Sequence, residues 1–263
     1  MGHHNDSLVT LDHGAIAQIA QRLANVQRVL WITGAGLSAD SGLPTYRGTG
    51  GLYDTSKTDD GISIEQALSA QTYATRPDLT WKYVSQVESA CTDAVPNAAH
   101  QIIAQSQTRF ESWVLTQNVD GLHRVAGSAN VIDIHGDIHD LYCPRCTWRE
   151  RVLSFLTLEK PPLCPQCGGW IRPDVVLFGE LLAQDKMRTL ARELACGFDA
   201  VLSIGTQSRF QYISQPVIDA RAANALTVEI NPDATSVSET VEFKLASGAA
   251  QTMTAIWQHL TQP

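Results

Sequence analysis

The chain has 263 residues, 44% of them hydrophobic, and a formal net charge of −8. This length and composition allow one large α/β domain with a small inserted module, and they exclude a largely disordered chain. The negative charge, without a basic stripe, disfavours direct binding to nucleic acid. The sequence shows no signal peptide and no apolar run near the roughly 18 residues of a membrane span, so we expect a cytoplasmic protein without membrane contact.

A glycine-rich turn stands near the start of the predicted fold. Apolar residues at helical spacing predict a helix over 14–27, and the apolar run 29–32 predicts a buried strand. Gly34, Gly36 and Ala39 then match the turn of a dinucleotide site, whose glycines let the backbone approach a pyrophosphate. An ordinary strand-to-helix turn explains the pattern about equally well. Polar residues crowd behind it and favour a loop that folds over a ligand: Ser38, Asp40, Ser41, Thr45, Tyr46 and Arg47.

Polar side chains also follow the next two predicted strands, 113–116 and 131–134. They are Gln117, Asn118 and Asp120 after the first strand and His135 after the second. Ligands of open α/β sheets bind beyond the carboxyl ends of strands, so these groups are candidates to bind a ribose or a nicotinamide. A polar turn is the alternative for the first group, and a structural histidine for the second. The ordinary pKa of histidine suits general-base catalysis at neutral pH.

The remaining chain continues the alternation of strands and helices. Further helices are predicted at 64–90 with an interruption at Pro77, from Pro96 onward with His100 interpreted as structural or exposed, and at 184–197, 213–224 and 249–260. Two more strands, 200–204 and 226–230, lead into Gly205 and Asn231. This order predicts a Rossmann-like, doubly wound parallel sheet covered on both faces. No acidic residue ends a second strand about 20 residues beyond the glycine turn, so Asn231 or Ser208 is expected to hold the adenosine ribose.

Four of the six cysteines form two Cys-x-x-Cys pairs, Cys143 with Cys146 and Cys164 with Cys167. The 17 residues between the pairs match the spacing of a four-cysteine zinc site. Four thiolates complete a tetrahedral Zn²⁺ shell with no open position, so we expect one structural zinc ion rather than two redox dithiols. Residues 141–171 are then a zinc-ribbon module, inserted between the two parts of the Rossmann-like domain, 14–140 and 172–260.

Taken together, these motifs resemble the sirtuins, NAD-dependent protein deacylases, and specifically the bacterial-type members that contain zinc. The resemblance covers roughly residues 28–253 in the family's order. It rests on residues 34–47, 116–123, 135–136, 175–180, 205–206 and 230–231 and on the two cysteine pairs.

The resemblance implies that NAD is consumed as a co-substrate and that the products are nicotinamide, O-acyl-ADP-ribose and free lysine. It implies His135 as the general base, with Asn118 and Asp120 as catalytic residues at the nicotinamide and its ribose. The implied NAD contacts are Gly34, Ala35, Gly36, Ser38, Asp40, Thr45, Tyr46, Arg47, Gln117, Asn118, Asp120, His135, Gly205, Thr206, Gln207, Asn231, Asp233 and Ala250. The cleft for an acylated-lysine peptide is implied to be lined by Val176, Phe178, Gly179 and Glu180. Residues 175–178 could pair with that peptide by strand addition, or form a plain core strand.

The preferred acyl group is predicted from a difference between this sequence and one branch of the sirtuins. Residues 44–48 resemble the sirtuin branch that removes succinyl and malonyl groups, which clamps the acyl carboxylate with a Tyr-x-x-Arg pair. That pair falls on Val84 and Val87 here, or on Tyr83 and Gln86 after a one-residue shift. Neither alignment supplies the Arg, so we expect weak desuccinylation and a preference for a neutral group such as acetyl.

Segment 207–212 also departs from the sirtuin pattern and leaves peptide preference open. Two other functions remain possible from the sequence. One is protein ADP-ribosylation or NAD hydrolysis, which uses the same activated ribose carbon. The other is a non-catalytic NAD-binding scaffold.

Overall fold

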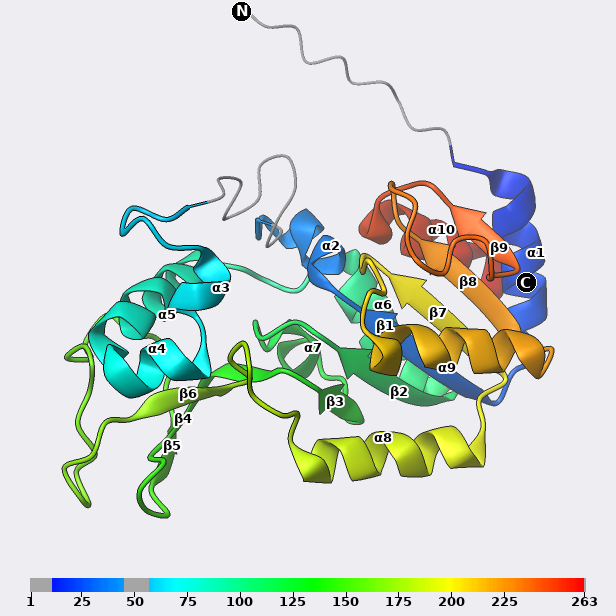
Figure 1. Ribbon diagram of the computed structural model, residues 1–263. Helices are drawn as coiled ribbons and strands as arrows, with labels where there is room; N and C mark the ends of the chain where they lie inside the picture. The colour runs from blue at the N-terminus through cyan, green and yellow to red at the C-terminus, as the bar shows by residue number, and fades with distance from the viewer. Residues whose placement is uncertain (1–10, 45–56, 263) are drawn as a thin grey trace, which may run out of the picture.

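A six-stranded parallel sheet forms the centre of the computed structural model, which describes residues 11–44 and 57–262 (Figure 1). Its strands run in the order β3-β2-β1-β7-β8-β9. They are β1 (Arg28–Thr33), β2 (Glu111–Thr116), β3 (Val131–Asp133), β7 (Ala200–Ile204), β8 (Leu226–Ile230) and β9 (Phe243–Leu245). The order reverses between β1 and β7, which is the switch point where doubly wound sheets bind ligands. The predicted Rossmann-like fold is confirmed.

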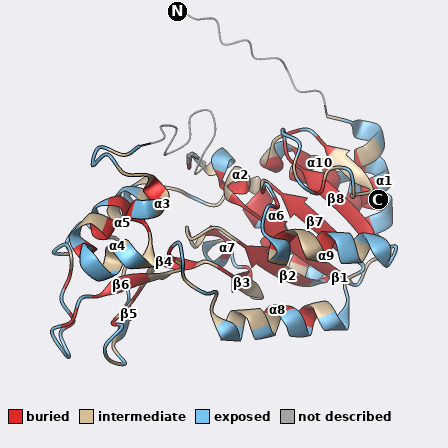
Figure 2. Cartoon of the chain, viewed as in Figure 1, coloured by how far each residue is buried: buried red, intermediate tan, exposed pale blue. Residues whose placement is uncertain are grey.

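Helices cover both faces of this sheet, as expected for strands that are buried along almost their whole length (Figure 2). On one face α1 (His13–Leu23), α6 (Ala98–Gln105) and α10 (Ala249–Thr261) share a core with the strands. On the other face α8 (Gln184–Cys196) and α9 (Gln211–Ala222) do the same. Within the described residues, no helix combines the length and the apolar character that crossing a membrane requires.

A second, smaller body lies beside the sheet and has its own hydrophobic core. It combines an antiparallel sheet of order β5-β4-β6 with two short helices and one long one. These elements are β4 (Gly136–Tyr142), β5 (Arg149–Arg151), β6 (Arg172–Val175), α3 (Ile64–Ala67), α4 (Ala70–Thr75) and α5 (Pro77–Cys91). The core joins Trp81 and Tyr83 of α5 to Phe155 and to Cys143 and Cys164. The boundary 141–171 stays a prediction, but this core extends well beyond it.

The helical stretch predicted over 64–90 is interrupted at Pro77 as expected, but a further break at Ser69 divides it into three helices. Ser63 caps α3 and Ser69 caps α4, each through its hydroxyl. Pro77 is the first residue of α5, where its missing N–H costs nothing. The strand expected at 175–178 is also displaced, since β6 ends at Val175. Short elements complete the fold: α2 (Ala35–Ser38), α7 (Leu122–Val125) and the 3₁₀ turns η1 (Ala39–Ser41) and η2 (Ser106–Thr108).

Candidate active site

The loops after β1 and β7 meet at the switch point of the sheet. Gly34 N–H donates to Ile204 O at 3.1 Å, and Gly36 N–H donates to Gly205 O at 2.8 Å. A Cβ on Gly36 would lie 2.8 Å from the Cα of Gly205, and one on Gly205 would lie 2.2 Å from Leu37 N. Gly205 also has a φ of 61°, which favours glycine. The glycines of the predicted dinucleotide turn are therefore required by contact between two loops.

Ser38 joins the two polar residues that follow β2. Its hydroxyl donates to Asp120 Oδ2 at 2.7 Å and accepts from Asn118 Nδ2 at 3.1 Å. The same Asn118 amide also lies 3.1 Å from Gly34 O. Burial raises the pKa of Asp120, against the hydrogen bonds from Leu122 N–H and Ser38 that lower it. The structure therefore brings three predicted site residues into one hydrogen-bonded group at the crevice.

His135 follows β3 and faces the same crevice. Its Nδ1 lies 3.1 Å from the carbonyl oxygen of Gln117, and Gln117 in turn donates to Thr206 Oγ1 at 2.6 Å. A carbonyl can only accept, so Nδ1 carries the proton of the neutral ring and Nε2 presents its lone pair. Burial lowers the pKa of His135, and the positive charge of Lys186 lowers it further. The imidazole is therefore neutral at pH 7 and able to accept a proton at Nε2.

Two aromatic residues that the sequence analysis did not assign contact this histidine. The hydroxyl of Tyr212 lies 2.7 Å from His135 Nε2. Phe210 stacks on Tyr212 with ring centroids 5.3 Å apart and planes 12° apart, and both rings stand edge-on to His135. Both belong to the segment that departs from the sirtuin pattern. The two aromatic residues of this segment, at positions i and i+2, are the sequence signal that could have pointed to this contact.

The residues predicted for the adenosine side are only partly free to contact a ligand. Asn231 donates through Nδ2 to Thr206 O at 3.1 Å and accepts from Asp233 N–H at 3.1 Å. Asp40 accepts from Ala250 N–H at 2.8 Å, near the N-terminus of α10. Gln207 and Asp233 are exposed.

Ser208, the alternative to Asn231, is turned inward. It is 1% exposed, and its hydroxyl lies 3.2 Å from Ser203 Oγ. Thr45, Tyr46 and Arg47, also predicted to contact NAD, lie outside the described residues.

The segment predicted for the peptide cleft is already paired along its backbone. Val176 N–H donates to His135 O, Leu177 N–H to the Glu180 carboxylate and Phe178 N–H to Leu68 O, at 2.8 to 2.9 Å. These N–H groups are bonded within the protein, so a peptide would have to pair through other backbone groups, and strand addition at 175–178 stays a prediction. Gly179 and the ring of Phe178 remain exposed beside the segment. Glu180 is held by Arg172 at 2.5 and 2.9 Å, so it fixes this turn.

The positions aligned with the succinyl clamp lie on α5. Val84 is buried and lines a narrow cavity, with no room for a water molecule as it stands, together with Tyr73, Trp81, Arg172, Val175 and Leu177. Val87 packs against the same core. In the shifted alignment, the hydroxyl of Tyr83 donates to Asp60 at 2.5 Å. Arg172 is the one cation among the described residues that line this cavity, and Glu180 already neutralises it.

A buried pair of histidines lies behind the crevice. His100 and His123 have ring centroids 4.9 Å apart, and His123 Nε2 lies 2.9 Å from the hydroxyl of Thr33. Burial lowers the pKa of His100 to about 4 and that of His123 to about 3. His100 is fully buried, so of the two interpretations given from the sequence, exposure is wrong.

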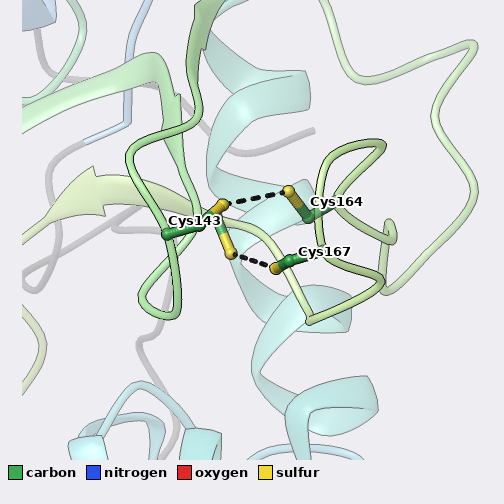
Figure 3. A group of neighbouring side chains, drawn as sticks. Cys143, Cys164 and Cys167 are labelled. Atoms are coloured by element: carbon green, nitrogen blue, oxygen red, sulfur yellow. Dashed lines mark hydrogen bonds between the residues drawn. The ribbon is translucent and has the colours of Figure 1, made fainter.

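The four cysteines of the two pairs converge in the smaller body (Figure 3). Their sulfur atoms all lie within 4.8 Å of one another, with Cys143 to Cys167 at 3.4 Å and Cys146 to Cys164 at 3.5 Å. Tetrahedral zinc with Zn–S bonds of about 2.3 Å places its sulfurs about 3.8 Å apart. These thiols therefore form a donor set that fits one Zn²⁺ ion.

Crevice, sheet order and cysteine cluster define a dinucleotide-binding α/β protein with a structural metal site. Residues 34–211 match the model of the Sir2 family. The chain is 48% identical over 252 residues to NAD-dependent protein deacylase 2 of Pseudomonas aeruginosa, an alignment that covers 94% of this chain and 98% of that protein.

Solved structures agree with this match. One is a complex of a Sir2 homologue with NAD, at 33% identity and a TM-score of 0.82, covering 92% of this chain and 93% of that one. Another is a complex of a mutant Sir2 homologue with 2′-O-acetyl ADP ribose, at 31% identity and a TM-score of 0.83, covering 92% and 95%. The chain belongs to the Sir2 family.

Proposed function

We propose that this protein is an NAD-dependent protein-lysine deacylase that moves the acyl group from lysine to ADP-ribose. One observation carries the proposal. A neutral histidine, His135, presents the Nε2 lone pair of a general base at the crevice that also holds Asn118, Ser38 and Asp120. A scaffold that only binds NAD needs no such base. Membership of a family whose relatives are named NAD-dependent protein deacylases supports the same activity.

Different polar residues of the crevice bind different parts of NAD. The N–H groups of Gly34, Gly36 and Leu37 are already bonded within the protein, which leaves Ala35 N–H in this turn for the pyrophosphate. Asn118 and Asp120 hold the nicotinamide amide and its ribose. Thr206, Gln207 and Asn231 line the adenosine side, with Asp40, Asp233 and Ala250 at its rim. These assignments rest on position at the carboxyl edge of the sheet.

The two substrates supply the reacting groups, and the protein supplies the base and holds the side chains in place. Bound NAD supplies a ribose carbon that the acyl oxygen attacks as nicotinamide leaves. His135 takes a proton from a ribose hydroxyl at Nε2, while Gln117 O holds the ring through Nδ1. Ser38 keeps Asn118 and Asp120 in fixed orientations. Zinc contributes structure only, because four thiolates leave it no open position.

The partner is a protein or peptide that carries an acylated lysine. Exposed Phe178 and Gly179, beside Val176, are the proposed wall of its cleft, and Glu180 fixes that wall through Arg172. We place the protein in the cytoplasm, where the four cysteines remain reduced and able to bind zinc.

Neutral acyl groups are the proposed substrates. A succinyl carboxylate near Val84 would meet no free cation among the described residues of the cavity, because Arg172 is paired with Glu180. Leaving a charge buried and unpaired costs several kcal/mol. We therefore expect kcat/KM for an acetyl-lysine peptide to exceed that for the matched succinyl-lysine peptide by at least about tenfold. A succinyl preference would overturn this assignment.

The activity is tested by mass spectrometry of a reaction with NAD and an acetyl-lysine peptide. The expected products are deacetylated peptide, nicotinamide and O-acetyl-ADP-ribose. His135→Ala is expected to lower their formation by about 10²- to 10⁴-fold, the usual contribution of a general base. If NAD is consumed while the peptide stays acetylated, NAD hydrolysis or protein ADP-ribosylation replaces deacylation. If no NAD is consumed with any acyl peptide, the protein is a scaffold.

A further inference from the structure

The lone pair that defines His135 as a base is already occupied. Its Nδ1 is committed to Gln117 O, so Nε2 is the one position at which the neutral ring can accept a proton. The hydroxyl of Tyr212 lies 2.7 Å from that nitrogen. Because Nε2 carries no hydrogen in this tautomer, Tyr212 is the donor.

We propose that the Tyr212 hydroxyl caps the general base of the NAD-free protein, and that a ribose hydroxyl of the nucleotide must replace it at His135 Nε2. This inference rests on the proposed function, because it takes His135 as the base. Tyr212 is a positioning residue in this account. It competes with the nucleotide for the base and takes no part in the proton transfer.

The phenol is well suited to hold the base and also to release it. Burial raises the pKa of Tyr212 to about 12, so the hydroxyl keeps its proton at neutral pH. The ring is held in place by stacking on Phe210, the residue that precedes α9. That stack lies at the surface, because Phe210 is 49% exposed and Tyr212 only half-buried, while the next residue, Ile213, is fully buried. The tyrosine can therefore turn away while Ile213 keeps α9 anchored in the core.

The Tyr212→Phe variant separates capping from other roles, because it keeps the stacked ring and removes only the hydroxyl. Replacing the cap costs the nucleotide one hydrogen bond, a net effect of about 0.5–1.5 kcal/mol or roughly two- to tenfold in affinity. We expect Tyr212→Phe to bind ADP-ribose tighter by that factor and to lower KM for NAD in parallel. We expect kcat to stay within about twofold, because the cap is already displaced in the bound state.

The experiment is calorimetric titration of ADP-ribose into the wild type, Tyr212→Phe, His135→Ala and the double variant. If Tyr212 acts through His135, its removal gains affinity in the wild-type background and gains nothing in the His135→Ala background. The matched control is Tyr142→Phe. Tyr142 is also half-buried, but it stands at the far end of β4, about 20 Å from His135 along the strand.

Each other result overturns the proposal in a recognisable way. Weaker binding by Tyr212→Phe in both backgrounds places the hydroxyl on the nucleotide itself. Unchanged binding with a large fall in kcat makes Tyr212 a proton relay. Equal binding and equal kcat make the contact incidental. The titration needs no turnover, so a wild-type protein that binds ADP-ribose but never deacylates would refute the proposed function and leave this comparison readable.

Discussion

The crevice of the large sheet and the smaller zinc-binding body are built on different principles. In the crevice, each group follows a single strand, so Gly34, Gln117, His135 and Gly205 reach one edge because parallel strands end there. The smaller body joins stretches that lie far apart in the chain. Trp81 Nε1–H donates to Ile171 O at 2.9 Å, and Phe155 N–H donates to the Glu88 carboxylate at 3.1 Å. We conclude that the crevice is positioned by the sheet, whereas the smaller body depends on long-range contacts and contains the four-cysteine donor set for a metal.

The largest effect is expected at the zinc site, where a substitution tests whether the two regions differ in this way. Cys164→Ser removes a buried thiolate from a site whose metal stabilises folding by roughly 10–16 kcal/mol in small zinc domains. We expect the smaller body to lose its structure while the parallel sheet retains most of its own. Tryptophan fluorescence should then report Trp81 and Trp148 as solvent-exposed, and far-UV circular dichroism should fall only in part. Cys196→Ser is the matched control, since that exposed thiol lies at the end of α8. Complete unfolding of both regions would contradict their independence.

The next effect tests the crevice itself. Asp120→Asn removes the charge that we propose binds NAD at the nicotinamide ribose, and a hydrogen bond to a charged group is worth about 1.5–3 kcal/mol. We expect kcat/KM for NAD to fall roughly 10- to 100-fold. Because burial raises the pKa of Asp120, its charged form is disfavoured in the fold, and the free energy of unfolding should stay equal or rise.

An aspartate-to-asparagine substitution at the amino ends of the strands, away from the crevice, gives the control. Asp199 accepts from the N–H groups of Gln27 and Arg28, where β1 begins. Asp199→Asn should lower stability by about 1 kcal/mol and leave the kinetics unchanged. Equal kinetic losses at both positions would show that the crevice carboxylate has no special role.

A smaller effect is expected from the buried histidines. Burial holds the pKa of His100 at about 4 and of His123 at about 3, below their ordinary value of 6.5. Below pH 6.5 the unfolded chain therefore binds more protons than the folded one, and stability falls as the pH is lowered. The slope is about 1.4 kcal/mol per pH unit for each histidine, from about pH 6.5 down to about pH 4.

Urea denaturation at pH 7, 6 and 5 measures this slope. His100→Asn should reduce it by about 1.4 kcal/mol per pH unit, whereas His259→Asn, on the exposed face of α10, should leave it unchanged. A slope that does not depend on His100 would place the acid sensitivity elsewhere.

The sequence predicted the strands and turns that surround the crevice well, because their signals are local. An apolar run followed by Gly34 or Asn118 identifies both a strand and the residues at its end, and the cysteine spacing identifies a metal site without any knowledge of the fold. The strand β9 escaped notice, since it has only three residues and pairs along β8.

Contacts between distant segments could not be predicted in this way. The break between α3 and α4 is accompanied by pairing of Leu68 and Ala70 with Phe178, more than 100 residues later. The contact of Tyr212 with His135 spans 77 residues and depends on how α9 packs on the sheet. The inward turn of Ser208 likewise follows from its contact with Ser203 in β7.

The most direct test of the account is the rate of nicotinamide release by the wild-type protein, with and without an acetyl-lysine peptide. A deacylase whose crevice is completed by the acyl group should release nicotinamide much faster when the peptide is present, with one lysine deacetylated for each nicotinamide formed. The same rate without the peptide, or nicotinamide release with no deacetylated lysine, would contradict the assignment.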